Sequence, residues 1–210
     1  MYPKLVVFDI DGTLLPDTTI ARHMAVFLDD LALIDQMEAA WETHNIDHQE
    51  FAIRSAEAYA GHRLDSLVEV AHSLPVINGA FDVIRTLRDN GTVVILATVS
   101  MAFAARVLVE RLGCNHAGGT ELELLDGVFT GRIAKFNDEA AKAEFVRSFA
   151  TERRIALQDV TAVGDSRSDI PLFGQVGRSI ALNASPAAIT AATHSISTRN
   201  LLDILPLLEV

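Results

Sequence analysis

The stretch LVVFDIDGT, residues 5–13, decides the fold of this 210-residue chain. Its first four residues are apolar and rich in valine, which predicts a short strand buried on both faces. Asp9 and Asp11 follow this strand directly, and Gly12 lets the backbone turn tightly beside them. A buried strand that runs into two carboxylates predicts a site at the carboxyl end of a parallel sheet.

Other short apolar runs predict the remaining strands of this sheet, at residues 92–98, 160–163, 179–182 and 195–197. Helical patterns lie between and after these runs, at residues 79–90, 102–112, 139–152, 186–192 and 200–208. Because strands and helices alternate, we expect an α/β fold with helices on both faces of a parallel sheet. Right-handed crossovers then bring the carboxyl ends of the strands to one edge.

Two segments break the alternation. Residues 16–77 contain amphipathic patterns that predict helices at 20–33, 35–41, 48–60 and 64–74. We interpret them as a small helical cap inserted after the first strand, so residues 1–15 and 78–210 form the core domain and residues 16–77 the cap domain. In residues 119–133, Asp126-Gly127 lies between two alternating runs and predicts a β-hairpin, because Asp-Gly tolerates the positive φ of a tight turn.

The predicted strands bring polar side chains to one edge of the sheet. Asp9 and Asp11 follow the first strand, Thr98 ends the second, Asp165 follows the third, and Lys142 lies near the start of the preceding helix. Carboxylates crowded at this edge would repel one another and take up protons unless a cation lies among them. Since the ligands are oxygen atoms, we expect the cation to be Mg²⁺.

These residue types suit phosphoryl transfer. Asp9 can attack phosphorus and form an aspartyl-phosphate, while Asp11 can protonate the leaving oxygen and then activate water. We expect Mg²⁺ to be held by Asp9, Asp165 and the backbone carbonyl of Asp11. Thr98 and the amides after Asp9 would hydrogen-bond the phosphoryl oxygens, and Lys142 would supply a positive charge.

Three further residues near this edge could take part in the site. Gly12 would let the backbone turn against the phosphate. Asp169 can orient Lys142 or a metal-bound water, although it can also simply cap the helix that follows. Lys135 is another lysine on a plausible approach to the site, and the sequence KAE around Lys142 favours Lys142.

The motifs together resemble those of the haloacid dehalogenase superfamily: DIDGT at 9–13, the strand that ends in Thr98, Lys142 in KAE, and GDSRSD at 164–169. The resemblance implies a Rossmann-like core with the cap in the first insertion point. Dehalogenases of this superfamily lack the second aspartate of the first motif, so Asp11 favours a phosphatase. The helical cap, the stretch LGCNHAGGTELELLDGVFTGRI and the stretch VTAVGDSRSDIPLF are most similar to phosphoserine phosphatases.

The same resemblance places substrate-binding positions on residues that depart from the family pattern. The substrate glutamate falls on Asp17, an asparagine on Ser168, and two glycines on Val99 and Ser100. The cap arginine that grips the substrate carboxylate has no counterpart in register, although Arg54 and Arg63 lie nearby in the sequence. We therefore predict that phosphoserine is not strongly preferred.

The composition of the chain limits the classes of molecule that it is expected to bind. The net charge is −11 and basic residues are not clustered, which argues against nucleic acid. No apolar stretch reaches the roughly 20 residues of a membrane span, and no secretory pattern opens the chain, so we expect a cytoplasmic protein. Cys114 is the only cysteine, which excludes an internal disulfide. The histidines show no metal-ligand spacing; they are residues 23, 44, 48, 62, 72, 116 and 194.

We expect a Mg²⁺-dependent phosphatase that acts on a small phosphorylated metabolite, and the sequence does not indicate an oligomeric state. One alternative is the same chemistry on a sugar phosphate or a nucleotide, or phosphoryl transfer to an acceptor alcohol. A second alternative is a non-catalytic regulator that binds a phosphorylated ligand. The second carboxylate, Asp11, speaks against such a regulator, because binding alone does not require an acid/base group.

Overall fold

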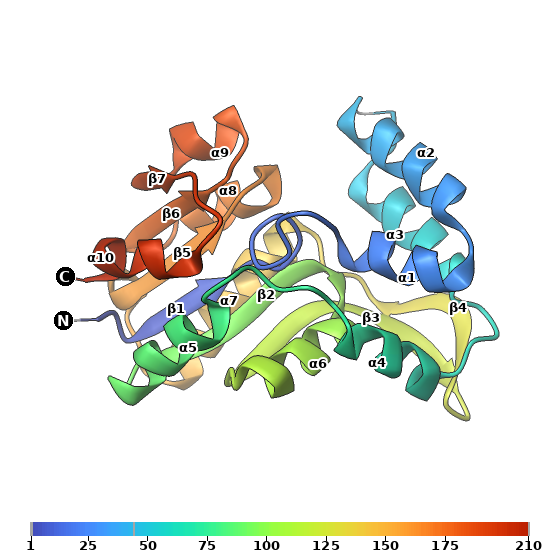
Figure 1. Cartoon of the computed structure of the whole chain (residues 1–210), viewed down its shortest axis with the longest axis horizontal. Coiled ribbons are helices and arrows are strands. Elements are labelled where there is room, and N and C mark those ends of the chain that lie inside the picture. The colour runs from blue at the N-terminus through green and yellow to red at the C-terminus, as the bar shows by residue number, and fades with distance from the viewer. Residues whose placement is uncertain (1, 44, 210) are drawn as a thin grey trace.

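A seven-stranded sheet in the order β4-β3-β2-β1-β5-β6-β7 organises this computed structural model, which describes residues 2–43 and 45–209 (Figure 1). Neighbouring strands are parallel except for the β3–β4 pair. The strands are β1 (Leu5–Phe8), β2 (Val93–Met101), β3 (His116–Leu125), β4 (Val128–Lys135), β5 (Val160–Gly164), β6 (Arg178–Leu182) and β7 (His194–Ile196). The predicted α/β fold with a mostly parallel, Rossmann-like sheet is confirmed.

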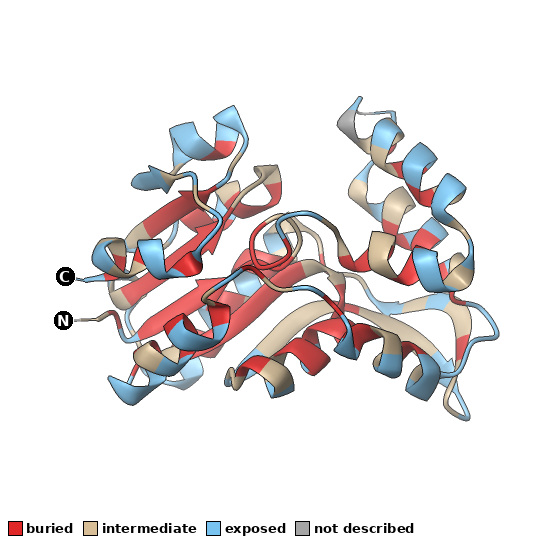
Figure 2. Cartoon of the chain, in the orientation of Figure 1, coloured by how far each residue is buried: buried red, intermediate tan, exposed pale blue. Residues whose placement is uncertain are grey.

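Helices cover both faces of this sheet, as the alternation of side chains along β1 requires. Val6 and Phe8 pack on one face with α4, α5 and α6, while Leu5 and Val7 pack on the other with α7, α8 and α9. Figure 2 shows the central strands almost entirely buried between these layers. The helices are α1 (Ile20–Leu28), α2 (Leu31–Glu42), α3 (His48–Ala58), α4 (Leu64–His72), α5 (Ala80–Asp89), α6 (Ala102–Leu112), α7 (Glu139–Glu152), α8 (Ile170–Phe173), α9 (Pro186–Ala191) and α10 (Leu205–Leu208).

The helix predicted over residues 20–33 is wrong in its length, because the chain turns within it. Thr19 caps the start of α1, where its hydroxyl accepts a hydrogen bond from the Arg22 amide. α1 ends where Asp29 adopts a left-handed conformation with φ of 56°, and α2 begins two residues later. The apolar pattern continues through this turn, so periodicity alone does not reveal the break.

The predicted hairpin forms, but it is part of the main sheet and not a separate insertion. Asp126 and Gly127 both have positive φ, at 51° and 78°, as a tight hairpin turn requires. β3 begins at His116, before the predicted start, and its first residues pair in parallel with β2. Its later residues pair antiparallel with β4, so the hairpin extends one edge of the sheet.

The helices between β1 and β2 divide their contacts between two apolar clusters. A small cluster joins α1 and α2 through residues such as Ala25 and Met37. α4 instead packs on α6, and its Leu67 and Ala71 belong to the largest cluster of the core. In Figure 1, α1, α2 and α3 accordingly stand apart from the two layers that cover the sheet. The domain boundaries at residues 16 and 77 stay a prediction.

The described helices are short, and the longest of them, α7, has 14 residues. Within the described residues, we find no helix with the length and apolar character that a bilayer crossing demands. The cytoplasmic location stays a prediction. The expectation that His44 takes no part in metal binding concerns a residue outside the described part of the chain.

Candidate active site

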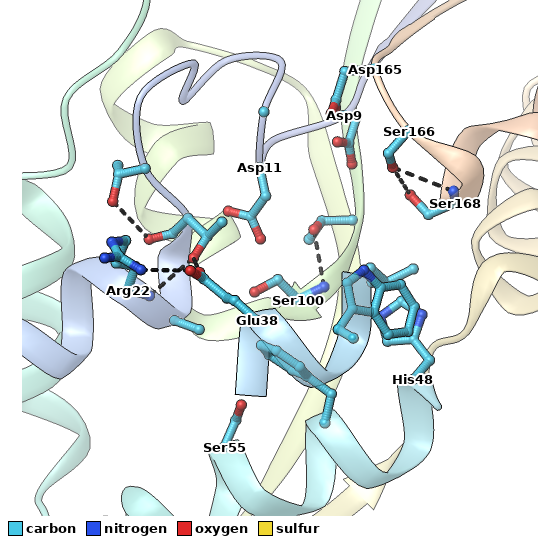
Figure 3. A pocket seen from close by; sticks show the side chains of 18 of the residues that line it. Asp9, Asp11, Arg22, Glu38, His48, Ser55, Ser100, Asp165, Ser166 and Ser168 are labelled. Carbon is cyan, nitrogen blue, oxygen red and sulfur yellow. Dashed lines mark hydrogen bonds and ion pairs between the residues drawn. The ribbon is translucent and has the colours of Figure 1, made fainter. Parts of the chain in front are cut away.

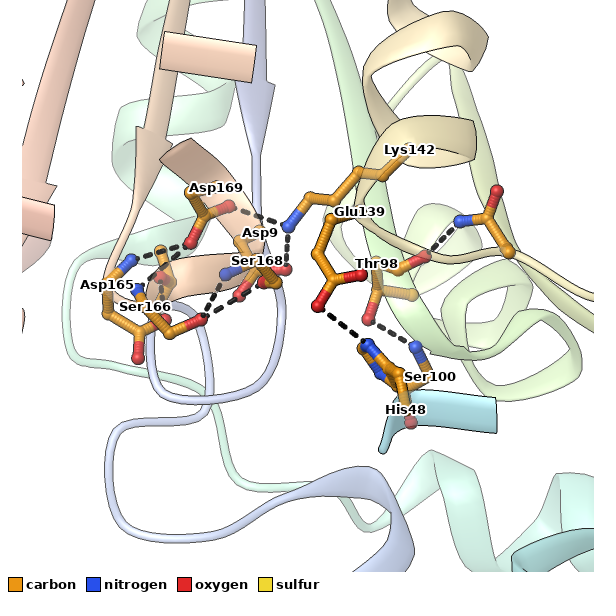
Figure 4. A network of polar contacts seen from close by, with 12 residues as sticks. Asp9, His48, Thr98, Ser100, Glu139, Lys142, Asp165, Ser166, Ser168 and Asp169 are labelled. Atoms are coloured by element: carbon orange, nitrogen blue, oxygen red, sulfur yellow. Dashed lines mark hydrogen bonds and ion pairs between the residues drawn. The ribbon is translucent and has the colours of Figure 1, made fainter. Parts of the chain in front are cut away.

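The carboxylate of Asp9 directly follows β1 and belongs to a buried ion-pair network (Figure 4). Its amide donates to the Val163 carbonyl of the neighbouring strand at 2.9 Å, so sheet pairing fixes its position. Lys142, fully buried on α7, donates from Nζ to Asp9 Oδ1 and to Asp169 Oδ1, each at 2.6 Å. The lysine therefore bridges two carboxylates that come from opposite ends of the chain.

A second group of contacts fixes Asp165 beside this network. Asp169 Oδ2 accepts from the amides of Asp165 and Ser166 at 3.0 and 3.1 Å, which holds the turn after β5. Thr13, fully buried, donates its hydroxyl to Asp165 Oδ1 at 2.9 Å. A Cβ on Gly12, whose φ is 82°, would lie 2.3 Å from Asp165 Oδ2. Only glycine therefore allows the turn after Asp9 to approach this carboxylate.

Asp11 faces the cavity and is held by the start of α1 (Figure 3). Its Oδ1 accepts a hydrogen bond from the Ile20 amide at 2.7 Å, and the polar side chain of Ser100 helps to lower its pKa. Burial raises the pKa of Asp11 to about 6, against the opposing effect of these two groups. A carboxyl group with this pKa is suited to giving and taking a proton near neutral pH.

β2 does not end at Thr98 as predicted but continues for three residues, to Met101, and Thr98 lies two residues past Leu96, the last residue of β2 that pairs with β1. This part of β2 is held by Asn137, a residue that was not predicted. Thr98 is fully buried, and its hydroxyl accepts from the Ser100 amide at 3.0 Å. The buried side chain of Asn137 donates from Nδ2 to the Thr98 carbonyl at 2.6 Å. Asn137 lies in the loop between β4 and α7, and no local motif identifies it, because its partner is distant in the sequence.

The charges at this edge fit a site for a divalent cation. Oxygen atoms of Asp9, Asp165 and Asp169 lie within 4.8 Å of one another. Burial raises the pKa of Asp165 to about 7, and the charge of Asp169 adds to this shift. Burial also raises the pKa of Asp9 well above its usual range, although Lys142 opposes the shift. Such a cluster favours a cation that would restore the charged carboxylates, and its all-oxygen ligands suit Mg²⁺.

Lys142 itself stays charged in this environment. Burial lowers the pKa of its ammonium group, but the charges of Asp169 and Asp9 outweigh that effect and raise the pKa above its ordinary value. The structure thus places Lys142 behind Asp9, where it holds the carboxylate. The predicted contact between Lys142 and a phosphoryl group stays a prediction.

A cavity of about 670 Å³ opens in front of these residues. Its sheet end is formed by Asp9, Asp11, Thr98, Asp165 and Ser166. The other predicted residues that line it are Gly12, Asp17, Val99, Ser100 and Ser168, whereas Lys142 and Asp169 lie behind its wall. The structure therefore brings all the predicted residues to one place, and their individual roles stay predictions.

The opposite wall, the cap end, is formed by Arg22, Glu38, Trp41, Phe51 and Ser55. These residues come from α1, α2 and α3, and they were not among the predicted site residues. Amphipathic patterns in the sequence locate their helices, but do not show which face points at the sheet.

Among the contacts between the cap helices and the core, two involve charged side chains of the core. The guanidinium carbon of Arg167 lies 3.5 Å from the centroid of the Trp41 ring. His48 Nδ1 lies 3.2 Å from the Glu139 carboxylate at the start of α7. Arg167 lies in the same turn as Asp165 and Asp169, so the cap contacts the segment that carries these carboxylates.

The two arginines near the expected carboxylate-binding position point elsewhere. Arg54 forms an ion pair with Glu50 on the same helix, and Arg63 pairs with Asp65 at 2.9 Å. Both side chains are about half exposed or more, at 45% and 60%. Neither belongs to the cavity wall within the described residues.

Comparisons with known proteins agree with this geometry. Residues 6–174 match the family model described as haloacid dehalogenase-like hydrolase. The chain is 31% identical over 208 residues to the phosphoserine phosphatase SerB2 of Mycobacterium tuberculosis, which covers 99% of this chain and 51% of that protein. It is 28% identical over 207 residues to the phosphoserine phosphatase of Methanocaldococcus jannaschii, covering 96% of each.

A solved structure of a substrate-bound phosphoserine phosphatase complex shares the fold, with a TM-score of 0.87 at 24% identity and 100% of both chains covered. The lengths of the relatives differ. The chain spans about half of two of the curated phosphoserine phosphatases that it matches, at 51% and 50%, and nearly all of the M. jannaschii protein.

Proposed function

The chain belongs to the family of haloacid dehalogenase-like hydrolases, and we propose that it is a Mg²⁺-dependent phosphatase that hydrolyses a small phosphomonoester through an aspartyl-phosphate on Asp9. The observation that carries this proposal is the buried bridge from Asp9 through Lys142 to Asp169, 2.6 Å on each side. This bridge holds the Asp9 carboxylate at the wall of a cavity that the Asp11 carboxylate also lines. Nucleophile and acid/base group thus stand at the same wall.

The first step forms a bond between an Asp9 oxygen and phosphorus and breaks the bond from phosphorus to the leaving oxygen. Lys142 favours the ionised form of Asp9 through its charge and orients the carboxylate for this attack. Asp11, protonated in part because its pKa is raised to about 6, donates its proton to the leaving alcohol. The alcohol then departs as a neutral molecule.

In the second step Asp11, now ionised, takes a proton from a water molecule as the water oxygen attacks phosphorus. The bond from phosphorus to the Asp9 oxygen breaks, which regenerates the Asp9 carboxylate and releases phosphate. The hydrogen bond from the Ile20 amide, 2.7 Å long, holds Asp11 in one position through both steps. One carboxyl group therefore serves first as acid and then as base.

The carboxylates of Asp9 and Asp165, with the Asp11 carbonyl, are the residues that would hold Mg²⁺. When bound, the ion supplies positive charge that offsets the charge of the phosphoryl group. Thr13 orients Asp165 for this role through its hydroxyl at 2.9 Å. The side chain of Asp169 is already committed to Lys142 and to two backbone amides, so we assign it to positioning.

A direct test uses p-nitrophenyl phosphate with and without Mg²⁺. We expect hydrolysis with Mg²⁺ and loss of it with EDTA. Asp9→Asn should lower kcat by at least about a thousandfold, because the amide cannot attack phosphorus. Hydrolysis that survives in Asp9→Asn, with the fold checked by circular dichroism, would contradict the mechanism.

The non-catalytic alternative predicts phosphate binding without turnover in the same assay. Activity with Mg²⁺ would exclude this non-catalytic regulator.

The proposed phosphatase function also includes a cytoplasmic location and action on a small phosphorylated metabolite.

A further inference from the structure

The cap end of the cavity contains a buried hydroxyl that no group of the described residues uses. Ser55, on α3, is 1% exposed and lines the cavity. Its Oγ has no hydrogen-bond partner among the described residues, and Figure 3 shows it at the cap end of the cavity. An unsatisfied buried hydroxyl costs about 1–3 kcal/mol, so a group that entered the cavity and hydrogen-bonded Ser55 would remove this cost.

The described part of this wall has no lysine or arginine that is without an acidic partner. Arg22 is the one lysine or arginine among the described cavity-lining residues. Its guanidinium donates from Nη1 to Glu38 at 2.5 Å and from Nη2 to Asp35 at 2.7 Å. A substrate carboxylate would have to compete with two carboxylates for this single guanidinium.

The remaining lining residues make this end unfavourable for an anion. Glu38 and Asp17 add negative charge to the wall, and Trp41, Phe51 and Ala52 add apolar surface. Glu38 already accepts from Thr19 as well as from Arg22, so its carboxylate is fixed in place. Hydroxyl groups can donate to such a carboxylate and exchange hydrogen bonds with Ser55, whereas C–H faces can pack on the apolar residues.

We infer that Ser55, Glu38 and Arg22 form a subsite for an uncharged, polyhydroxylated leaving group, so the substrate is the phosphate monoester of a sugar or polyol. This inference rests on the proposed phosphatase function and specifies its substrate class. The cavity volume of about 670 Å³ lies within the range of small-molecule sites and leaves room for a leaving group larger than serine. Ser55 and Glu38 are the residues that select it.

The first experiment compares four substrates on the full chain with Mg²⁺: the phosphate monoesters of glucose and sorbitol at a terminal primary hydroxyl, phosphoserine, and p-nitrophenyl phosphate. We expect kcat/KM for a sugar or polyol phosphate to exceed that for phosphoserine by at least about tenfold, the effect of roughly 1.4 kcal/mol of differential binding. A higher value for phosphoserine would overturn the inference while leaving the phosphatase function intact. Absence of p-nitrophenyl phosphate hydrolysis would instead overturn the proposed function and the inference with it.

The second experiment removes the subsite groups one at a time. Ser55→Ala should lower the ratio of kcat/KM for the sugar phosphate over p-nitrophenyl phosphate by about three- to tenfold, the value of one hydrogen bond. Ser66→Ala, an exposed helical serine on α4, is the matched control and should leave the ratio unchanged.

Glu38→Gln adds a prediction that a purely structural role would not produce. It removes one of the two charges that occupy Arg22, so phosphoserine should gain in kcat/KM relative to the sugar phosphate by about three- to tenfold. Two results together would contradict a selecting role for this subsite. They are equal changes in kcat/KM for the sugar phosphate and p-nitrophenyl phosphate in Ser55→Ala, and equal changes for the sugar phosphate and phosphoserine in Glu38→Gln.

Discussion

The sheet end and the cap end of the cavity hold their charges in different ways. At the sheet end, Asp9, Lys142 and Asp169 are at most 5% exposed and are joined by contacts of 2.6 Å. At the cap end, Arg22 is 38% exposed and Glu38 is 27% exposed. A buried charge that loses its partner cannot be hydrated at low cost, whereas a partly exposed charge can. Substitutions of the charged residues at the sheet end should therefore destabilise the protein strongly. Substitutions at the cap end can alter substrate preference at a smaller cost in stability.

The largest effect on stability is expected for Lys142→Met, at the sheet end. It leaves Asp9 and Asp169 buried without their cation, and we expect the free energy of unfolding to fall by about 3–5 kcal/mol in urea denaturation. Arg85→Met is the matched control, because Arg85 pairs with Asp82 on the surface, where the side chains are 72% and 52% exposed. This control should lose less than about 1 kcal/mol. Equal losses in the two variants would show that burial does not distinguish these ion pairs.

The close approach at Gly12 gives the next largest effect. In Gly12→Ala, the added Cβ would meet Asp165 Oδ2 at 2.3 Å, so the carboxylate has to move. We expect kcat/KM to fall by about a hundredfold or more and the Mg²⁺ concentration for half-maximal activity to rise, since displacements of about 1 Å at a reacting centre have effects of this size.

Gly91→Ala controls for the backbone. Gly91 has the same φ of 82°, but nothing lies within 4 Å of its Cβ position. It should lose about 1–2 kcal/mol of stability from the left-handed conformation and keep its kcat/KM. An equal loss of activity in both variants would assign the effect to the backbone and not to Asp165.

A smaller effect is expected where the cap end touches the sheet end. Trp41→Leu removes the ring on which the Arg167 guanidinium lies at 3.5 Å, a contact of about 0.5–2 kcal/mol. Because this contact holds the cap against the core, KM should rise by about three- to tenfold while kcat changes less. Trp41→Phe keeps an aromatic ring and should recover part of the loss. A fall in kcat alone would place Trp41 with the chemical step instead.

The two ends also differ in how far the sequence predicts them. Asp9, Asp11 and Asp165 follow buried strands, and Thr98 lies in the last part of β2. Because a parallel sheet brings the carboxyl ends of its strands together, their meeting could be predicted from local patterns. Asn137 and the contact of Thr13 with Asp165 were not predicted, although Thr13 belongs to the motif at residues 9–13, because the partners are distant in the chain and polar side chains in loops are common.

At the cap end the sequence predicts helices but not their orientation. Whether Ser55 or Arg54, adjacent on α3, faces the cavity depends on how that helix packs against β4. The break at Asp29 likewise depends on a single left-handed residue inside a continuous apolar pattern. Tertiary packing decides both features, and periodicity does not report it.

The mildest expected effect is on pH dependence, through His48 at the junction of the two ends. Burial lowers the pKa of His48, and the charges of Arg167 and Lys142 act in the same direction, while Glu139 opposes them. The unfolded chain therefore binds the proton more readily, and the free energy of unfolding should fall as the pH drops below the ordinary histidine value of about 6.5. His48→Gln cannot take up this proton, so the stability difference from the wild type should depend on pH.

Urea unfolding from about pH 8 to pH 5 measures this dependence, with pH 8 as the internal reference because histidine is neutral there in both states. The wild type should lose stability relative to His48→Gln over this interval, by about 1 kcal/mol or less. If the wild type instead gains stability relative to the variant as the pH falls, the Glu139 ion pair outweighs burial. The junction would then be an acid-strengthened contact between the cap and the core.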